Sequence, residues 1–268
     1  YCYESPHPPL GKLLIGLGIL IFGMNPFGWR IVGTLFGIAM CPVMYVFCKR
    51  MTRSTPLSTL GCWLLAFDFM HFVQTRIATI DVYITFFVMA MYLFMYEYVF
   101  LTQKDKPFKE SLRPLFFCGL AMGLGIACKW TGVYAGAGLA VIFFASLLRQ
   151  RSPRESAAEY RRRAWRTMGL CVVFFVVVPA IIYTLSYLPF EDGSNHSVLR
   201  KMLENQFDMF AYHTNEQRAH RFASRWYEWP IMVRPIWYFA DISTGAEGSG
   251  GLRENSSAFG NPAVGWLG

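Results

Sequence analysis

The sequence predicts an all-α polytopic membrane protein, with about six transmembrane helices and further helices at the membrane interface. Hydrophobic residues make up 54% of the chain and charged residues only 16%, whereas a soluble domain carries about 25% charged residues. Apolar runs of roughly 15 to 20 residues recur along the chain, close to the length that a transmembrane helix needs. The basic residues cluster between these runs, which favours a role in membrane orientation and argues against a nucleic-acid partner.

Residues 1–28 are predicted to form an interfacial segment on the outer face of the membrane. His7 precedes a proline and is therefore pushed towards extended backbone. Pro9 can open a helix, because the N–H that it lacks has no intrahelical partner at the first helical position. A helix from there to about Gly23 would be roughly 20 Å long. That is too short to cross a hydrocarbon core of about 30 Å, so we expect the helix to lie along the interface.

Residues 29–188 are predicted to form the transmembrane bundle. The first span covers residues 29–47 and the last covers 170–188. The apolar stretch 57–101 would be nearly 70 Å long as one helix, roughly twice a bilayer, so it must turn, and its polar patch at 68–81 marks the turn. The stretch 115–148, about 50 Å as one helix, forms a second hairpin with Lys129 near its turn.

Charge predicts the orientation of these six spans. The loops around residues 49–53, 104–113 and 149–166 hold three, four and seven Lys or Arg residues. The positive-inside rule places these loops in the cytoplasm. Both ends of the chain, and all five histidines, then fall on the outer side.

Residues 189–268 are predicted to be an outer-face loop that leads to a further span. Within it, residues 199–210 place leucine, methionine and phenylalanine at helical spacing with charged residues between them, which predicts an amphipathic helix. A stretch rich in Gly, Ser and Asn follows at 243–261. Because the chain begins at Tyr1 and ends as a new apolar stretch starts, we expect it to be an internal piece of a longer protein.

Five motifs carry a resemblance to a known family. They are His-Pro-Pro-Leu-Gly-Lys at 7–12, Trp-Arg-Ile-Val-Gly at 29–33, the segment 74–81, Cys-Lys-Trp-Thr-Gly at 128–132, and the aromatic segment 225–238. In this order and together they resemble the protein O-mannosyltransferases, with the last motif in the style of the bacterial members. The resemblance covers nearly the whole chain and implies a helical bundle of the GT-C type.

The resemblance also implies a reaction and a place. A member of this family transfers mannose from a polyprenyl-phosphate carrier to Ser or Thr hydroxyls of acceptor proteins on the extracytoplasmic face, with inversion at the anomeric carbon. Its Asp-Glu pair would lie upstream of Tyr1, which leaves Glu4 as the only carboxylate beside the first motif. The outer segment is too short for the large luminal insertion of eukaryotic members, which favours a bacterial plasma membrane protein.

Arg30 is the leading candidate for a ligand of the donor phosphate. It lies at the outer end of a span, and a guanidinium binds phosphate oxygens through two parallel hydrogen bonds. The resemblance places the family's essential arginine at this position. The alternative is an arginine that reaches the lipid headgroups.

Other charged residues on the outer side have both a functional and a structural interpretation. Lys129, inside a hairpin of small and apolar residues, needs a partner, which a phosphate, Asp68 or Asp81 could supply. Arg76 and Asp81 flank a turn, where an ion pair or helix cap is as plausible as a substrate contact.

Three further residues complete the candidate set of substrate-binding residues. His7 and Lys12 could contact the donor or position the upstream carboxylates, and His7 could equally be a turn histidine bonded to backbone. Arg234 could reach the phosphate or anchor the outer segment.

No cofactor is required by this chemistry. A divalent metal held by outer-side histidines with Asp68 and Glu4 is the alternative, but no HxH or HxxxH spacing supports it. Two rival functions remain: a GT-C enzyme that moves another lipid-linked sugar onto a lipid or glycan, and a transporter. A transporter would be expected to show duplicated halves, and no internal repeat is evident.

Overall fold

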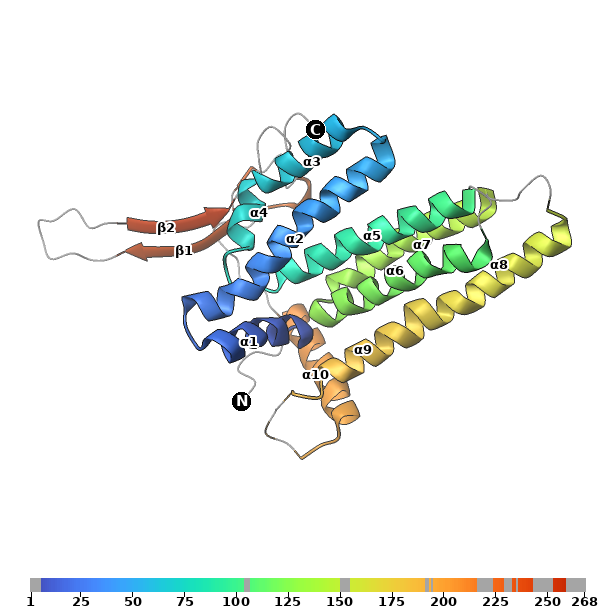
Figure 1. Ribbon diagram of the computed structural model, residues 1–268. Coiled ribbons are helices and arrows are strands. Elements are labelled where there is room, and N and C mark those ends of the chain that lie inside the picture. Colours follow the sequence, from blue (N-terminus) through green and yellow to red (C-terminus); the bar gives the residue numbers. More distant parts are fainter. Residues whose placement is uncertain are drawn as a thin grey trace, which may run out of the picture.

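The computed structural model describes residues 6–103, 107–149, 155–190, 193, 195–215, 224–228, 233–234, 236–242 and 253–258. Within them the chain forms a bundle of roughly antiparallel helices, with the helix Val198–Asn215 and a two-stranded ribbon at one end (Figure 1). Five helical segments in the described part are long and apolar enough to cross a membrane, which makes the chain an integral membrane protein. They are α2 (Pro26–Thr52), α5 (Asp81–Gln103), α6 (Phe108–Cys128), α7 (Thr131–Arg149) and the continuous segment Ala157–Ser186.

The all-α membrane fold is confirmed, but one of the six predicted spans is shorter than expected. Helix α3 (Thr55–Ala66) has 12 residues, about 18 Å, and is followed by the six-residue helix α4 (Phe69–Gln74). The helix is interrupted between them because the backbone of Asp68 is extended. The Asp68 side chain then caps α4 by accepting a hydrogen bond from the backbone N–H of His71. The two helices together run back along α2.

The first helix matches its prediction closely. Helix α1 (Leu10–Phe22) begins directly after Pro9 and ends at Gly23, whose φ of 86° is in the region that favours glycine. Asn25 then caps α2 by accepting hydrogen bonds from the backbone N–H groups of Phe27 and Gly28. The turn is therefore sharp, and α1 folds back against α2 (Figure 1).

The centre of the bundle is formed by α5, α6 and α7. Helices α5 and α6 pack side by side as an antiparallel pair, and α7 covers them. Their interface is buried and apolar, with Met91, Met95, Leu115 and Leu139 almost fully enclosed. The hairpin predicted at 115–148 is present, since α6 ends at Cys128 and α7 begins at Thr131.

The last span is a single segment that changes its helical geometry once. Helix α8 (Ala157–Val172) starts with a capping box between Ser156 and Glu159 and passes through a π-helical turn at Val173–Val177 into α9 (Val178–Ser186). Pro179 explains the turn, because proline removes one backbone donor and its ring displaces the carbonyl four residues earlier.

The described part of residues 189–268, which were predicted to be an outer-face loop, includes an expected helix and a ribbon that was not predicted. Helix α10 (Val198–Asn215) is the expected amphipathic helix and lies across the end of the bundle (Figure 1). Strands β1 (Ile236–Ile242) and β2 (Arg253–Ala258) form an antiparallel ribbon beside α4. The β-forming run Ile-Trp-Tyr-Phe in β1 supports a strand, although the sequence alone indicated only an aromatic segment here. The further span predicted near the end lies outside the described residues.

The bundle separates the candidate site from the basic loops. The starts of α1, α2, α5 and α7 and the ends of α6 and α9 meet at one end, which we call the site end. The ends of α2, α5 and α7 and the starts of α3, α6 and α8 form the opposite, basic end. The predicted alternation of the loops is therefore present in the structure.

Candidate active site

An ion pair between two helix ends lies at the centre of the site end. Asp81 is the first residue of α5, and Lys129 caps the C-terminus of α6 in extended conformation. The ammonium of Lys129 donates a hydrogen bond of 2.7 Å to Oδ1 of Asp81. The two side chains are 24% and 43% exposed, so the pair is reachable from solvent. Of the partners that the sequence allowed for Lys129, the structure selects Asp81.

His7 lies beside this pair. Its ring centroid is 5.4 Å from that of His213 in α10, and His213 Nε2 lies 2.9 Å from the carbonyl oxygen of Pro6. Burial lowers the pKa of His7 to about 4, and the positive charge of Lys129 adds to this shift. His213 and Lys12 act in the same direction, and Asp81 opposes them. His7 is therefore neutral at pH 7 and can donate a hydrogen bond without adding charge.

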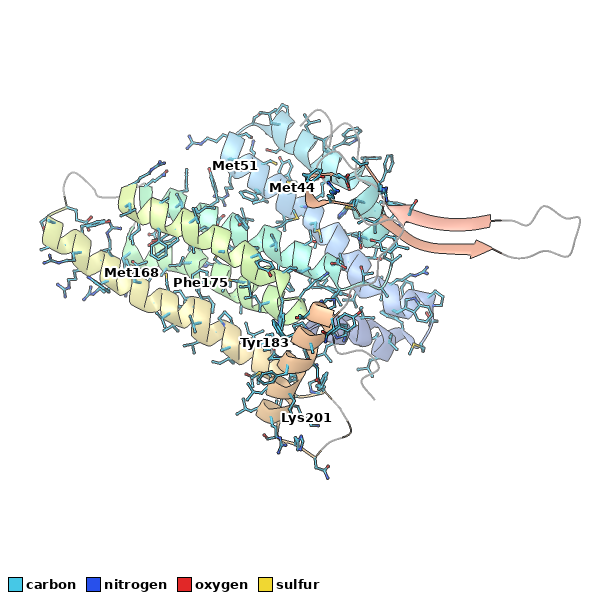
Figure 2. The ribbon with its side chains drawn as sticks, turned by 180° about the vertical axis from the view of Figure 1, so that it is seen from behind. Met44, Met51, Met168, Phe175, Tyr183 and Lys201 are labelled. Atoms are coloured by element: carbon cyan, nitrogen blue, oxygen red, sulfur yellow. The ribbon has the colours of Figure 1, made fainter. Side chains whose placement is uncertain are left out.

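A chain of side-chain hydrogen bonds fixes α10 over the α6–α7 turn. The indole N–H of Trp130 donates to the hydroxyl of Tyr183 in α9 over 3.1 Å, and that hydroxyl donates to Oε1 of Gln206 over 2.7 Å. The Gln206 amide donates in turn to the hydroxyl of Tyr187, which donates to Asn205. Figure 2 shows Tyr183 at the crossing of α9 and α10. The helix that brings His213 to His7 is thus bonded to α9, which is bonded in turn to the α6–α7 turn.

A pocket of about 270 Å³ adjoins the ion pair on the side of α4. Asp81 forms part of its wall, together with the polar side chains of Asp68, His71, Gln74 and Thr85. The amide of Gln74 donates to the hydroxyl of Tyr238 in β1, which links the ribbon to this wall. Burial and the nearby Asp81 carboxylate raise the pKa of Tyr238, so the hydroxyl keeps its proton. The polar side chains of this pocket are able to hydrogen-bond hydroxyl groups, and Met40, Leu65, Met70 and Val82 supply the apolar part of its wall.

Two arginines lie at the surface on neighbouring elements of the site end. Arg30 is exposed in the first turns of α2, and Arg76 is exposed after α4 with its guanidinium 3.7 Å from the ring centroid of Phe72. The hydroxyl of Thr34 lies within hydrogen-bonding distance of the carbonyl oxygens of Arg30 and Thr75, at 3.1 and 3.0 Å. That contact ties the two elements together.

Two candidates remain, Arg234 and Glu4. Arg234 is exposed just before β1. Glu4 lies outside the described residues. Across the part of the chain that the structure describes, no three His, Cys, Asp or Glu side chains gather as a metal site would require.

The structure adds residues that the sequence interpretation missed. Tyr183, Tyr187, Asn205 and Gln206 were not candidates, although they form the support between α9 and α10. The signal was present as two tyrosines four residues apart in the last span and two adjacent amides on an amphipathic helix. Their pairing could not be found without knowing that α9 and α10 cross.

The sequence of this chain matches the model of a known protein family. The model of the dolichyl-phosphate-mannose-protein mannosyltransferases matches residues 19–190, well over half of the chain. The chain belongs to this family. The predicted resemblance is thereby confirmed, and the match covers Arg30, Arg76, Asp81 and Lys129 but not His7.

Curated relatives of this mannosyltransferase family are similar along most of the chain. The polyprenol-phosphate-mannose–protein mannosyltransferase of Mycolicibacterium smegmatis is 26% identical over 88% of this chain and 53% of its own length. The protein of the same name from Mycobacterium tuberculosis is 26% identical over 97% of this chain and 58% of its own. The chain thus spans about half the length of the curated relatives it matches.

Two solved structures share the fold. The Saccharomyces cerevisiae protein O-mannosyltransferase Pmt1–Pmt2 complex, bound to the sugar donor, superposes with a TM-score of 0.59 at 16% identity, over 70% of this chain and 27% of that one. ArnT from Cupriavidus metallidurans in the apo state gives a TM-score of 0.57 at 15% identity, over 85% and 37%. These likenesses confirm the GT-C type bundle.

Proposed function

We propose that this chain forms the donor-binding part of a polyprenyl-phosphate-mannose–protein mannosyltransferase. The observation that carries the proposal is the family match over residues 19–190, which includes the helix ends that place Arg30, Asp81 and Lys129 at one end of the bundle. The names of the mycobacterial relatives support a polyprenol-phosphate-mannose donor and a protein acceptor.

The proposed reaction is an inverting displacement. The oxygen of an acceptor Ser or Thr hydroxyl attacks the anomeric carbon of mannose from the face opposite the phosphate. The bond between that carbon and the phosphate oxygen breaks, the lipid phosphate leaves with the electron pair, and the hydroxyl proton passes to a carboxylate base. From the resemblance to the family, we expect this base to be a carboxylate of the Asp-Glu pair that precedes the His-Pro-Pro-Leu-Gly-Lys motif.

The described residues supply charge and orientation in this reaction. Arg30 stabilises the negative charge that develops on the leaving phosphate, with Lys12 and Arg76 as further cations at the same end. Neutral His7 donates a hydrogen bond to a donor oxygen. Asp81, fixed by Lys129 and lining the 270 Å³ pocket, accepts hydrogen bonds from sugar hydroxyls.

The same proposal assigns the site to the outer face of a bacterial plasma membrane. The basic loops at the opposite end support this orientation through the positive-inside rule. The site end is then the extracytoplasmic end, where an acceptor protein and the carrier's phosphate meet at the level of the lipid headgroups.

Mannose transfer tests the function directly. Membranes from cells that express the gene are given polyprenyl-phosphate mannose labelled in the sugar, together with an acceptor peptide rich in Ser and Thr. Arg30→Ala should lower the transfer rate by about 100- to 1,000-fold, as for the loss of one group that stabilises transition-state charge, while leaving expression intact. Near-normal transfer by Arg30→Ala would exclude its role at the phosphate.

The same assay includes a matched control variant and other lipid-linked sugars as donors. Arg161→Ala removes an exposed arginine from the basic end and should leave the rate unchanged. Other lipid-linked sugars, including aminoarabinose, are offered in parallel. Efficient transfer of one of these without transfer of mannose would replace the proposed donor.

A further inference from the structure

A groove of about 650 Å³ opens at the basic end, far from the candidate active site. Helix α5 forms its floor, and α2 and α6 form its walls. Four cationic side chains line it: Lys49 and Arg50 from α2, Arg53 from the residue that caps α2, and Arg113 from α6. Two carboxylates also line it, so positive charge is in excess.

The backbone around these cations is held in place. Arg53 has a φ of 56°, the one positive φ recorded for a non-glycine residue in the described part of the chain. Glycine is the usual residue at such a helix end, because a side chain there is strained. The Arg53 guanidinium lies 5.8 Å from the ring centroid of Phe100, and the hydroxyl of Tyr96 donates to the carbonyl of Arg50 over 3.0 Å. An arginine at a position suited to glycine, facing into a groove, indicates a use for its side chain.

The groove has both charged and apolar lining. Apolar and aromatic side chains also line it, among them Phe94, Leu101, Pro114 and Phe117, and Phe94 and Phe117 lie further along α5 and α6 from the basic end. A solvated cluster of loop arginines would need no such lining. A phospholipid has the matching shape, with a phosphate that guanidinium groups bind through paired hydrogen bonds and acyl chains that pack on aromatic rings.

We propose that this groove binds one anionic phospholipid from the leaflet at the basic end. The phosphate lies between Arg50, Arg53 and Arg113, and an acyl chain follows Phe94 and Phe117. Basic pockets between transmembrane helices are a recurrent way to hold anionic lipid headgroups. The site is separate from mannose transfer, because it occupies the other end of the bundle.

Other arginines at the basic end are not among the described residues that line the groove, and they serve as a comparison. Arg161 and Arg162 of α8 are exposed and are not among the lining residues that the structure describes. Arg163 is bonded to Glu155 over 2.9 Å. If net charge alone attracted anionic lipid, these residues would contribute as much as those in the groove.

The test measures lipid binding to the full chain in a non-ionic detergent by native mass spectrometry. Phosphatidylglycerol is the anionic probe, phosphatidylcholine the zwitterionic one, and inorganic phosphate the free anion. The double variant Arg53→Gln/Arg113→Gln should weaken phosphatidylglycerol binding by about tenfold or more. The control Arg161→Gln/Arg162→Gln removes the same charge and should change binding less than about twofold.

A gain of binding separates the proposal from simple misfolding. Glu97 lies 3.5 Å from Arg50 in the groove, and Glu97→Gln should release that arginine and tighten phosphatidylglycerol binding by about fivefold. Equal losses in the two double variants would overturn the proposal, and so would equally tight binding of phosphatidylcholine. Binding of inorganic phosphate at these arginines without binding of phosphatidylglycerol would overturn the assignment to a lipid.

Discussion

At the site end, Lys129 is bonded to Asp81 and lies beside the half-buried His7, so three separate segments of the chain contribute this cluster. At the basic end, Arg161 and Arg162 stand exposed on one helix. The same kind of charge therefore serves two purposes. Exposed cations at the basic end are suited to orienting the bundle in the membrane, whereas Lys129 at the site end is positioned by Asp81, a partner 48 positions away in sequence, as a binding residue would be.

We expect the basic end and the site end to lie on opposite sides of the membrane. In a variant whose seven native cysteines are replaced, a cysteine at Arg161 should react with a membrane-impermeant maleimide only from the cytoplasmic side. A cysteine at Met24, which is 76% exposed at the site end, should react only from outside. The expected difference is all or none, measured in intact cells and inverted vesicles. Labelling of both positions from one side would contradict the orientation.

The ion pair at the site end should matter more than any single cation at the basic end. Lys129→Ala leaves the Asp81 carboxylate without its cation and should lower the free energy of unfolding in detergent by roughly 1 to 2 kcal/mol, between the values for exposed and buried pairs. Arg162→Ala should leave it unchanged.

The double variant Asp81→Asn/Lys129→Gln shows whether the pair also serves catalysis. It should recover most of the stability, because no unpaired charge remains. Mannose transfer should stay low if Asp81 binds the sugar. Recovery of both stability and transfer would reduce the pair to a structural role.

Loss of the side-chain hydrogen bonds between α9 and α10 should have a smaller effect on stability. Gln206→Leu removes the link between Tyr183 and Tyr187 and should cost about 1 kcal/mol for each lost hydrogen bond. We expect α10 to become more sensitive to limited proteolysis and mannose transfer to fall. Phe207→Leu alters a neighbouring exposed position and serves as the control. Unchanged proteolysis of Gln206→Leu would show that the bonds do not hold the helix.

The smallest effect concerns pH. The pKa of His7 is lowered to about 4 from an ordinary value near 6.5, so the unfolded chain binds more protons than the folded chain between these values. Stability should therefore fall as the pH drops from about 6.5 to 4 and stay level above that. The loss should be at most about 2 kcal/mol, because a half-buried group is screened by solvent. His7→Gln should flatten this part of the curve, and an unchanged curve would assign the dependence to another group.

The local pattern of the sequence was sufficient for much of the fold. Long apolar runs must cross the bilayer whatever their neighbours are, so the helices, the hairpin at Lys129 and the position of α10 followed from length and periodicity. The grouping of His7, Arg30, Arg76 and Lys129 at one end followed from the alternation of spans and loops.

Other features depend on which distant segments meet. The break at Asp68, which shortens α3, and the ribbon of β1 and β2 were not foreseen, because both depend on local capping and pairing that outweigh composition.

The sequence by itself determined that the chain is a helical membrane protein with its candidate residues at one end. Only the tertiary structure decided which of them touch. Lys129 could have paired with Asp68, Asp81 or a phosphate, and the close packing of α5 on α6 brings Asp81 within 2.7 Å. His7 meets His213 across more than 200 positions because α10 folds back over the bundle. Hydrophobic length is a property of one segment, whereas a site is a property of several segments packed together.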